Sequence, residues 1–214
     1  DFFRTTTDAR KGSTGFYLGG QARLSGMLDV TGGVRQEEDE DFGGNTTWNL
    51  GGVLSVPGLP LPVRLRAAAG TSFKAPSLYQ RYGSIPGFFQ GNPNLKPEKG
   101  ESWEVGAEVD LPLAGRTSTI AVTYFENRIR DLIDFNDAFD TLENRDRAKI
   151  SGVEAVLTLR PFAWLEAIAS YTWLDARDQA TGTLLPRRPA HSGSLAATIT
   201  PVQGVQVTPE IIYA

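Results

Sequence analysis

Long segments in which apolar and polar side chains alternate dominate this sequence. Over residues 16–34, every even position is apolar or glycine and most odd positions are polar. A period of two places successive side chains on opposite faces of a strand, so each such segment predicts a strand with one apolar face. The alternation recurs over residues 48–56, 63–73, 103–111, 120–124, 153–159, 165–173, 195–199 and 205–213.

The connections between these segments alternate in length. Short turns are expected near Ser25, Pro57, Pro112, Pro161 and Pro201. Longer loops are expected over residues 37–45, 75–100, 131–145 and 176–188. The pattern gives about ten strands of about 10–14 residues, enough for a tilted strand to cross a bilayer. Outer-membrane barrels join short periplasmic turns with longer extracellular loops, so the sequence predicts an all-β, antiparallel transmembrane β-barrel.

Composition excludes several other classes. Mean hydropathy is −0.23, and no run approaches the ~18 apolar residues that a membrane-spanning helix needs. The chain has no cysteine and a net charge of −4, which removes disulfide and thiolate chemistry and argues against nucleic-acid binding. His191 is the only histidine, so a zinc site or a histidine-based triad lacks parts. We therefore expect no enzyme, no metal site and no resident cofactor.

The two faces of the predicted strands differ in charge. Charged residues at the polar parity are Arg23, Asp29, Arg64, Arg66, Glu104, Glu108, Glu154 and Glu166. In a wide barrel these groups meet water or a plug domain. Aromatic residues on the apolar face near the long-loop ends predict a membrane girdle, formed by Trp48, Phe73, Trp103 and Trp173. A soluble β-sandwich, for example a carbohydrate-binding module, is the alternative that such alternation leaves open.

Residues 70–109 carry several spaced motifs in a fixed order. They are Phe73-Lys74-Ala75-Pro76, Leu78-Tyr79, Gly91-Asn92-Pro93, Leu95-Lys96-Pro97-Glu98, and Glu104 with Gly106. This order resembles the barrel of TonB-dependent outer-membrane receptors. Further matches cover the rest of the chain, at residues 124–133, 144–154, 171–176 and 185–191. The resemblance is closest to the branch of cobalamin receptors and catecholate-siderophore receptors.

The resemblance implies a barrel of about 22 strands whose lumen is filled by a plug domain. Residues 1–214 are then expected to be a partial barrel domain, without the plug and the closing strands. It also implies energised uptake through the TonB complex, which acts on an N-terminal segment that this sequence lacks. The expected surroundings are lipid and lipopolysaccharide of a Gram-negative outer membrane, and the expected oligomeric state is a monomer.

The loop over residues 78–90 is the main candidate for ligand recognition, because it mixes rigid aromatic rings with hydrogen-bond donors. Its candidate residues are Tyr79, Arg81, Tyr82, Phe88, Phe89 and Gln90. Asp134 and Phe135, followed by Phe139 and Asp140, form a weaker candidate on the next loop. The alternative is that these aromatics only cover the barrel mouth.

The motif residues themselves are interpreted as structural. Prolines fix φ at loop and strand-entry positions, and Asn92-Pro93 is a turn-initiating pair. Lys96 and Glu98 flank the entry to the next strand, where they are placed to pair. The acidic run at residues 37–41 lacks the spacing of a calcium loop and predicts a solvated loop.

The sequence thus predicts an outer-membrane receptor for a bulky, scarce nutrient, with cobalamin preferred and a ferric siderophore as the alternative. A passive porin, or a surface-binding barrel without energy coupling, is the alternative from another class.

Overall fold

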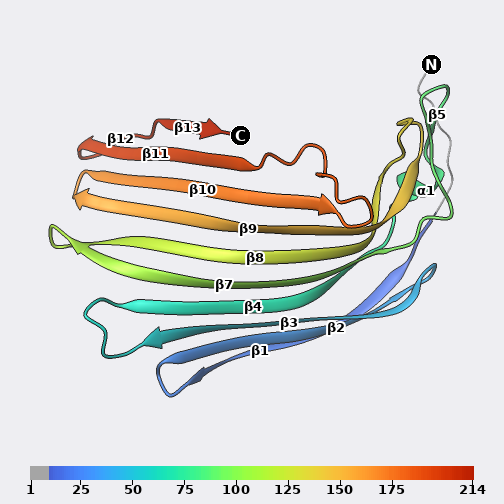
Figure 1. The fold of residues 1–214 in the computed structure, drawn as a ribbon. Helices are drawn as coiled ribbons and strands as arrows, with labels where there is room; N and C mark the ends of the chain where they lie inside the picture. Colours follow the sequence, from blue (N-terminus) through green and yellow to red (C-terminus); the bar gives the residue numbers. More distant parts are fainter. Residues whose placement is uncertain (1–9) are drawn as a thin grey trace.

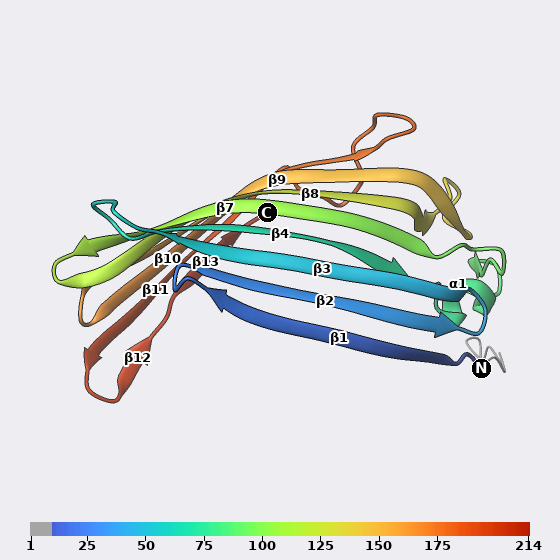
Figure 2. The ribbon, with the colours of Figure 1, turned by 90° about the horizontal axis from the view of Figure 1, so that it is seen from below.

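The computed structural model describes residues 10–214, except for the side chain of Asp146. It is an antiparallel sheet of long strands that curves along its width (Figures 1 and 2). The sheet strands are β1 (Ser13–Leu24), β2 (Leu28–Asp39), β3 (Gly43–Val56), β4 (Val63–Lys74), β7 (Glu98–Leu113), β8 (Arg116–Phe135), β9 (Leu142–Phe162), β10 (Leu165–Asp178), β11 (His191–Val202), β12 (Val205–Val207) and β13 (Glu210–Tyr213).

Strands that are neighbours in the chain pair with one another in this sheet, except that β13 pairs with β11 rather than with β12, and β4 pairs directly with β7. The segment between them forms α1 (Leu78–Tyr82) and a small hairpin of β5 (Ser84–Ile85) and β6 (Phe89–Gln90). β12 and β13 both pair with β11, as two halves of a strand interrupted near Pro209, which has no N–H to donate. Counted this way, the sheet has the predicted number of strands, and within residues 10–214 it does not close into a barrel.

The connections at one side of the sheet are short, the longest being residues 57–62, whereas those at the other side range from the turn at residues 40–42 to residues 75–97. We call the side with the short turns the turn end and the opposite side the loop end, which lie at the left and right of Figure 1. Two of the short turns need backbone in the left-handed region, at Ser25-Gly26 (φ 55° and 65°) and at Ala114-Gly115 (φ 51° and 75°). Positive φ at both central residues matches the twist of a two-residue hairpin, and glycine adopts it without steric cost.

Two of the predicted long loops are wrong in extent. The expected loop over residues 37–45 is a turn of residues 40–42 between β2 and β3. The expected loop over residues 131–145 is largely strand, because β8 continues to Phe135 and β9 begins at Leu142. Hydrophobic alternation could not reveal these extensions, because it is lost beyond the apolar band while the backbone ladder continues: residues 36–39 are all polar, and Leu132 and Ile133 are apolar at successive positions.

The buried core is small and lies at the loop end. Phe89, Leu95 and Leu142 form it, with Ile85 and Ile133 packed against them. On the sheet itself, large apolar side chains on one face stay exposed, as Leu50 (55%) and Leu195 (51%) show. A soluble protein rarely exposes an apolar face of this extent, so the face requires an apolar surrounding. Among the described residues, no helix is long and apolar enough to cross a membrane.

Candidate functional site

The segment between β4 and β7 is an ordered structure at the loop end. Pro76 is fully buried, and Ser77 caps the short helix α1. The Ser77 hydroxyl accepts a hydrogen bond from the Gln80 N–H (3.1 Å), and the Gln80 side chain accepts one from the Ser77 N–H (2.8 Å). This reciprocal capping satisfies two donors that a helix start leaves free. The helix therefore has a fixed start directly after the buried proline.

The same segment is fastened to the β8–β9 hairpin. Leu95 and Phe89 pack on Leu142, and the Asn92 side-chain N–H donates to the Leu142 carbonyl (2.9 Å). Asn144 clamps the chain further along. Its side-chain oxygen accepts from the Lys96 N–H (2.8 Å), and its amide donates to the carbonyls of Lys96 (3.0 Å) and Asp131 (2.7 Å).

The predicted motif residues lie within this segment and at its two ends. Phe73 and Lys74 end β4, Ala75 follows them, and Pro93 and Pro97 lie in the stretch that leads into β7. The expected pairing of Lys96 with Glu98 is wrong. Glu98 instead forms an ion pair with Lys74, its cross-strand partner (2.7 Å), and accepts the Ile133 N–H (2.8 Å). Side chains two apart on one strand share a face but lie further apart than a directly opposed cross-strand pair.

Aromatic residues from two connections meet at the loop end. The Tyr79 and Phe89 rings stack with centroids 5.2 Å apart, Phe89 meets Phe135 edge-on at 6.0 Å, and Phe135 stacks on Phe139 at 6.0 Å. Of the predicted recognition residues, the structure thus brings Tyr79, Phe89 and Phe135 together. Phe89 is buried, whereas Tyr79 (55%) and Phe139 (64%) are exposed.

Phe88 is the most exposed aromatic of this region, at 77%. It lines a hollow of about 580 Å³ between the β5–β6 hairpin and the tip of the β8–β9 connection. Gln90 lines the same hollow, and its carbonyl accepts the Thr141 hydroxyl (2.6 Å). Asp134 is engaged locally, since its carboxylate accepts the N–H of Phe135 (2.8 Å).

Arg81 is held by the β2–β3 turn rather than directed at solvent. It forms an ion pair with Asp41, and its guanidinium lies 5.2 Å from the Phe42 ring and 4.9 Å from the Tyr82 ring. Cation–π contacts of this kind favour arginine over an aromatic face. Asp41 and Phe42 were not predicted as partners of the loop over residues 78–90. The opposite charges of Asp41 and Arg81 were the one feature of the sequence that could have indicated this contact.

The acidic run is solvated only in part: Glu38, Glu40 and Asp41 are exposed as predicted, whereas Glu37, Glu38 and Asp39 belong to β2 rather than to a loop. Asp39 is buried at 3% exposure; its carboxylate pairs with Lys11 (2.8 Å) and accepts the N–H groups of Asp41 (3.0 Å) and Phe42 (3.2 Å). Burial acts to raise the pKa of Asp39, but these partners outweigh it and hold the pKa below its ordinary value. Glu40 accepts the Gly12 N–H (2.8 Å).

The polar face of the sheet carries paired charges. Arg64 binds both Glu108 (2.9 Å) and Asp110 (2.6 Å) across the β4–β7 ladder. The pairs Arg23–Asp29 (2.7 Å) and Arg160–Glu166 (2.6 Å) bridge neighbouring strands in the same manner. A face of this kind can line an aqueous lumen, because each charge has both water and an opposite charge nearby.

Comparisons with known proteins agree with this architecture. The chain matches the family model described as TonB dependent receptor-like, beta-barrel over residues 2–206. Its fold is similar to that of the siderophore receptor PirA from Pseudomonas aeruginosa, with a TM-score of 0.74 and 20% identity over 94% of this chain and 37% of that one.

Two further solved structures show the same likeness. One is a mutant of the ferric enterobactin receptor PfeA from Pseudomonas aeruginosa in complex with enterobactin, with a TM-score of 0.76 and 19% identity over 94% of this chain and 32% of that one. The other is the copper transporter OprC, with a TM-score of 0.68 and 14% identity over 87% of this chain and 32% of that one. The chain spans about a third of the length of these structures.

Proposed function

Because this chain belongs to the TonB-dependent receptor β-barrel family, we propose that it forms part of the wall and exterior mouth of a receptor for energised nutrient uptake. Proteins of this family lie in the outer membrane of Gram-negative bacteria. The observation that carries the proposal is the division of the sheet into an apolar face and a face of paired charges, with the ordered aromatic structure at its loop end. An apolar face opposite a face of paired charges suits a receptor and transporter, and it does not support an enzymatic function.

The loop-end aromatics support a ligand with flat apolar groups. Tyr79, Phe88 and Phe139 offer exposed rings on a supported scaffold, and rigid aromatics contribute contact area at low conformational cost. A ferric siderophore with aromatic iron-binding groups is the first candidate. Structures described as siderophore and ferric enterobactin receptors favour this class. Cobalamin, the ligand preferred from the sequence, is the second candidate, because its macrocycle is also large and flat.

Energy coupling completes the proposal. A plug in the lumen and the TonB complex would act through a segment other than residues 1–214, and the receptor would work as a monomer. In a passive porin, the runner-up function, uptake depends only on the concentration gradient. Uptake by the receptor encoded by the complete gene should therefore stop when TonB is deleted, and undiminished uptake without TonB would favour the porin.

Uptake of labelled ligands by cells expressing the complete receptor tests which ligand the receptor imports. We expect the cells to take up a ferric catecholate siderophore. In the double variant Phe88→Ala with Phe139→Ala, we expect the receptor to bind this siderophore about tenfold or more weakly, because loss of aromatic anchors has an effect of this size. Phe162→Ala is the matched control, because Phe162 is an exposed aromatic (51%) at the turn end. Uptake of cyanocobalamin alone would overturn the siderophore proposal while leaving the receptor function standing.

A further inference from the structure

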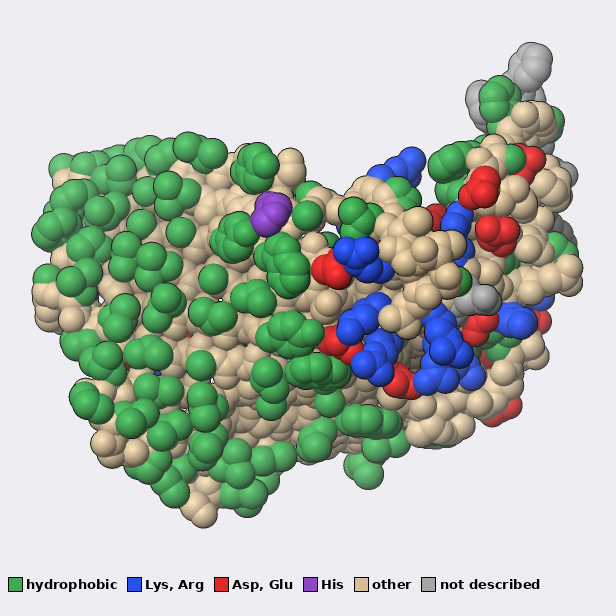
Figure 3. All heavy atoms as spheres, in the orientation of Figure 1, with side chains coloured by type: hydrophobic (Ala, Val, Ile, Leu, Met, Phe, Trp, Pro, Cys, Tyr) green, Lys and Arg blue, Asp and Glu red, His purple; other side chains and the backbone are tan. Residues whose placement is uncertain are grey.

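A further hollow at the loop end lies between the β8–β9 hairpin and the connection from β10 to β11. Its volume is about 330 Å³, and it is lined by Phe135, Phe139 and Arg145 of the hairpin and by Arg187 and Arg188 of the connection. We call it the arginine cleft. In Figure 3, hydrophobic side chains cover the strand bodies, and charged side chains gather at their loop end. The cleft therefore lies beyond the apolar band, on the exterior side of an outer-membrane barrel.

The apolar wall of the cleft is continuous with the loop-end aromatic residues described above. Phe135 stacks on Phe139 at 6.0 Å and meets Phe89 edge-on at 6.0 Å, so the Phe135 ring belongs to both surfaces. Phe139 (64% exposed) and, from the other side of the cleft, Leu184 (64%) present apolar surface to solvent. An aromatic group that enters the cleft would contact rings that the protein already holds in place.

Arg187 and Arg188 bring positive charge that the protein does not neutralise. Both side chains are exposed. Among the residues that the structure describes, neither arginine forms an ion pair or a side-chain hydrogen bond. A ligand can therefore bind these guanidinium groups without first breaking a contact within the protein.

The carboxylates of the cleft are engaged elsewhere. Asp178 is buried and accepts the Ala180 N–H (2.8 Å). Asp134 lies 3.8 Å from Arg145, which also pairs with Asp137 (3.3 Å). The acids near the cleft thus balance Arg145, and the remaining two arginines make the cleft a site for an anion.

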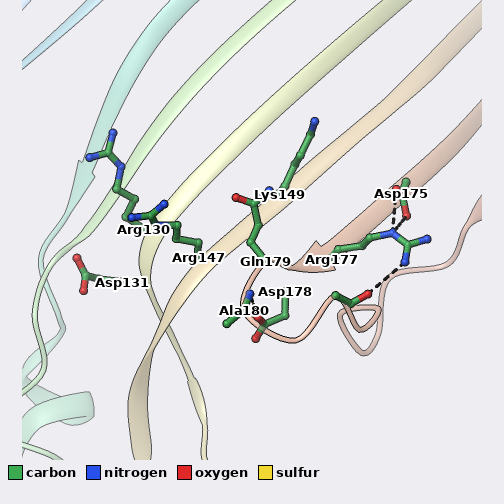
Figure 4. A pocket seen from close by; sticks show the side chains of 10 residues that line it. Arg130, Asp131, Arg147, Lys149, Asp175, Arg177, Asp178, Gln179 and Ala180 are labelled. Carbon is green, nitrogen blue, oxygen red and sulfur yellow. Dashed lines mark hydrogen bonds and ion pairs between the residues drawn. The ribbon is translucent and has the colours of Figure 1, made fainter.

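The connection that carries these two arginines has an ordered backbone. The Leu185 N–H donates to the Ala176 carbonyl (2.9 Å). Arg177 braces the same connection, because its guanidinium binds Asp175 (2.8 Å) and the Gly182 carbonyl (3.2 Å) (Figure 4). A supported backbone lowers the ordering cost of binding a ligand.

We propose that the arginine cleft binds one anionic aromatic arm of an iron chelate, with the ring against Phe139 and the charged oxygens on Arg187 and Arg188. A guanidinium presents paired N–H donors to two neighbouring oxygens, and such charge-assisted bonds are stronger than neutral ones. A volume of about 330 Å³ lies at the lower end of the range for small-molecule sites, so it suits one arm rather than a whole chelate. This inference rests on the proposed function and adds that the receptor selects its ligand by negative charge.

Charge separates two classes of iron chelate. Three catecholate groups carry more negative charge than iron(III) neutralises, so their complex is an anion. Three hydroxamate groups balance the metal and give a neutral complex. Only the anion gains from the unneutralised guanidinium groups, and the cleft therefore favours a catecholate complex over a trihydroxamate of similar size.

Calorimetric titration of the purified complete receptor with ferric enterobactin tests the proposal. We expect the double variant Arg187→Gln with Arg188→Gln to bind it about tenfold or more weakly than the wild type, because charge-assisted hydrogen bonds are lost. Arg187→Lys with Arg188→Lys keeps the charge and loses the paired donors, so its affinity should lie in between. Arg116→Gln is the matched control, because Arg116 is an exposed arginine at the turn end of β8; its affinity should equal that of the wild type.

The outcomes separate the cleft from the proposed function. Equal affinity of the double variant and the wild type would overturn the cleft and leave the siderophore function standing, whereas a wild type that does not bind ferric enterobactin would overturn both. A neutral ferric trihydroxamate that binds as tightly as ferric enterobactin would contradict selection by charge. Displacement of ferric enterobactin by inorganic phosphate would show a site for any anion and would also contradict the proposal. If the double variant does not assemble, Arg188→Gln alone decides.

Discussion

Single polar side chains hold the loop end together by satisfying backbone groups. Asp39 does so for the β2–β3 turn, where it joins Lys11 to the N–H groups of Asp41 and Phe42. Buried carboxylates with several donors are stable in the charged form, and protonation removes part of that stabilisation. The effect of such a residue is local, because the turn can open without disturbing the sheet.

Asp39 gives the turn a predictable pH dependence. Its pKa in the folded protein is below its ordinary value, so its contribution is fully present above about pH 4 and is lost as pH falls through the folded pKa. We expect Asp39→Ala to speed hydrogen exchange at the Asp41 and Phe42 amides about tenfold at neutral pH. The protection factors of these amides in the wild type, which correct for the intrinsic pH dependence of exchange, should fall to those of Asp39→Ala only in acid.

Asp39→Asn is the matched control, because asparagine keeps an acceptor and loses the charge. Its protection of the two amides should lie between those of the wild type and Asp39→Ala, without the acid transition. Identical exchange in all three proteins would show that Asp39 does not hold the turn.

At the scale of elements, the β4–β7 connection is joined to the β8–β9 hairpin. The apolar contact of Leu95 and Phe89 with Leu142 provides burial, and Asn144 provides three hydrogen bonds. These contacts keep the exposed aromatic rings on a defined surface, which reduces the ordering cost of binding.

Asn144→Ala should release this connection while leaving the sheet intact. Removing three hydrogen bonds, each of about 1 kcal/mol, should make residues 75–97 cleavable by protease at least about tenfold faster. Limited proteolysis of the receptor in detergent measures this rate. Asn94→Ala is the control, since Asn94 is exposed and lies on the same connection. Equal cleavage of both variants would contradict the role assigned to Asn144.

At the scale of the whole molecule, the two faces of the sheet face different solvents. Exposed apolar residues cover one face, and ion pairs such as Arg64 with Glu108 and Asp110 cover the other. Trp103 lies towards the loop end of β7, and Trp164 lies in the turn between β9 and β10, stacked on Phe162 at 5.3 Å. This separation suits aromatic belts at the two membrane boundaries.

Quenching by brominated lipids tests that arrangement. In receptors that retain either Trp103 or Trp164 as the only tryptophan, bromine near the lipid carbonyls should quench more strongly than bromine at the chain ends. The reason is that aromatic belts lie at headgroup level on both sides of the bilayer. Stronger quenching of Trp103 by chain-end bromine, or none by any lipid, would contradict the proposed girdle.

Hydrophobic alternation by itself determined the fold class, the number of strands and the two faces. Each strand carries its own period of two, and local turn residues such as Ser25-Gly26 mark where it reverses. For the same reason the sequence supports a structural interpretation of Pro76 and Asn92, since their backbone preferences are local.

Only the tertiary structure decided which distant residues meet. The pairing of Arg81 with Asp41, the clamp of Asn144 on Lys96 and the alignment of Arg128, Lys149 and Arg177 all depend on strand register. Register is a property of two strands together, and beyond the apolar band the hydrophobic alternation that would fix it in one sequence is lost. The apolar face could therefore be predicted from the chain, whereas the loop-end site exists only once the strands are aligned.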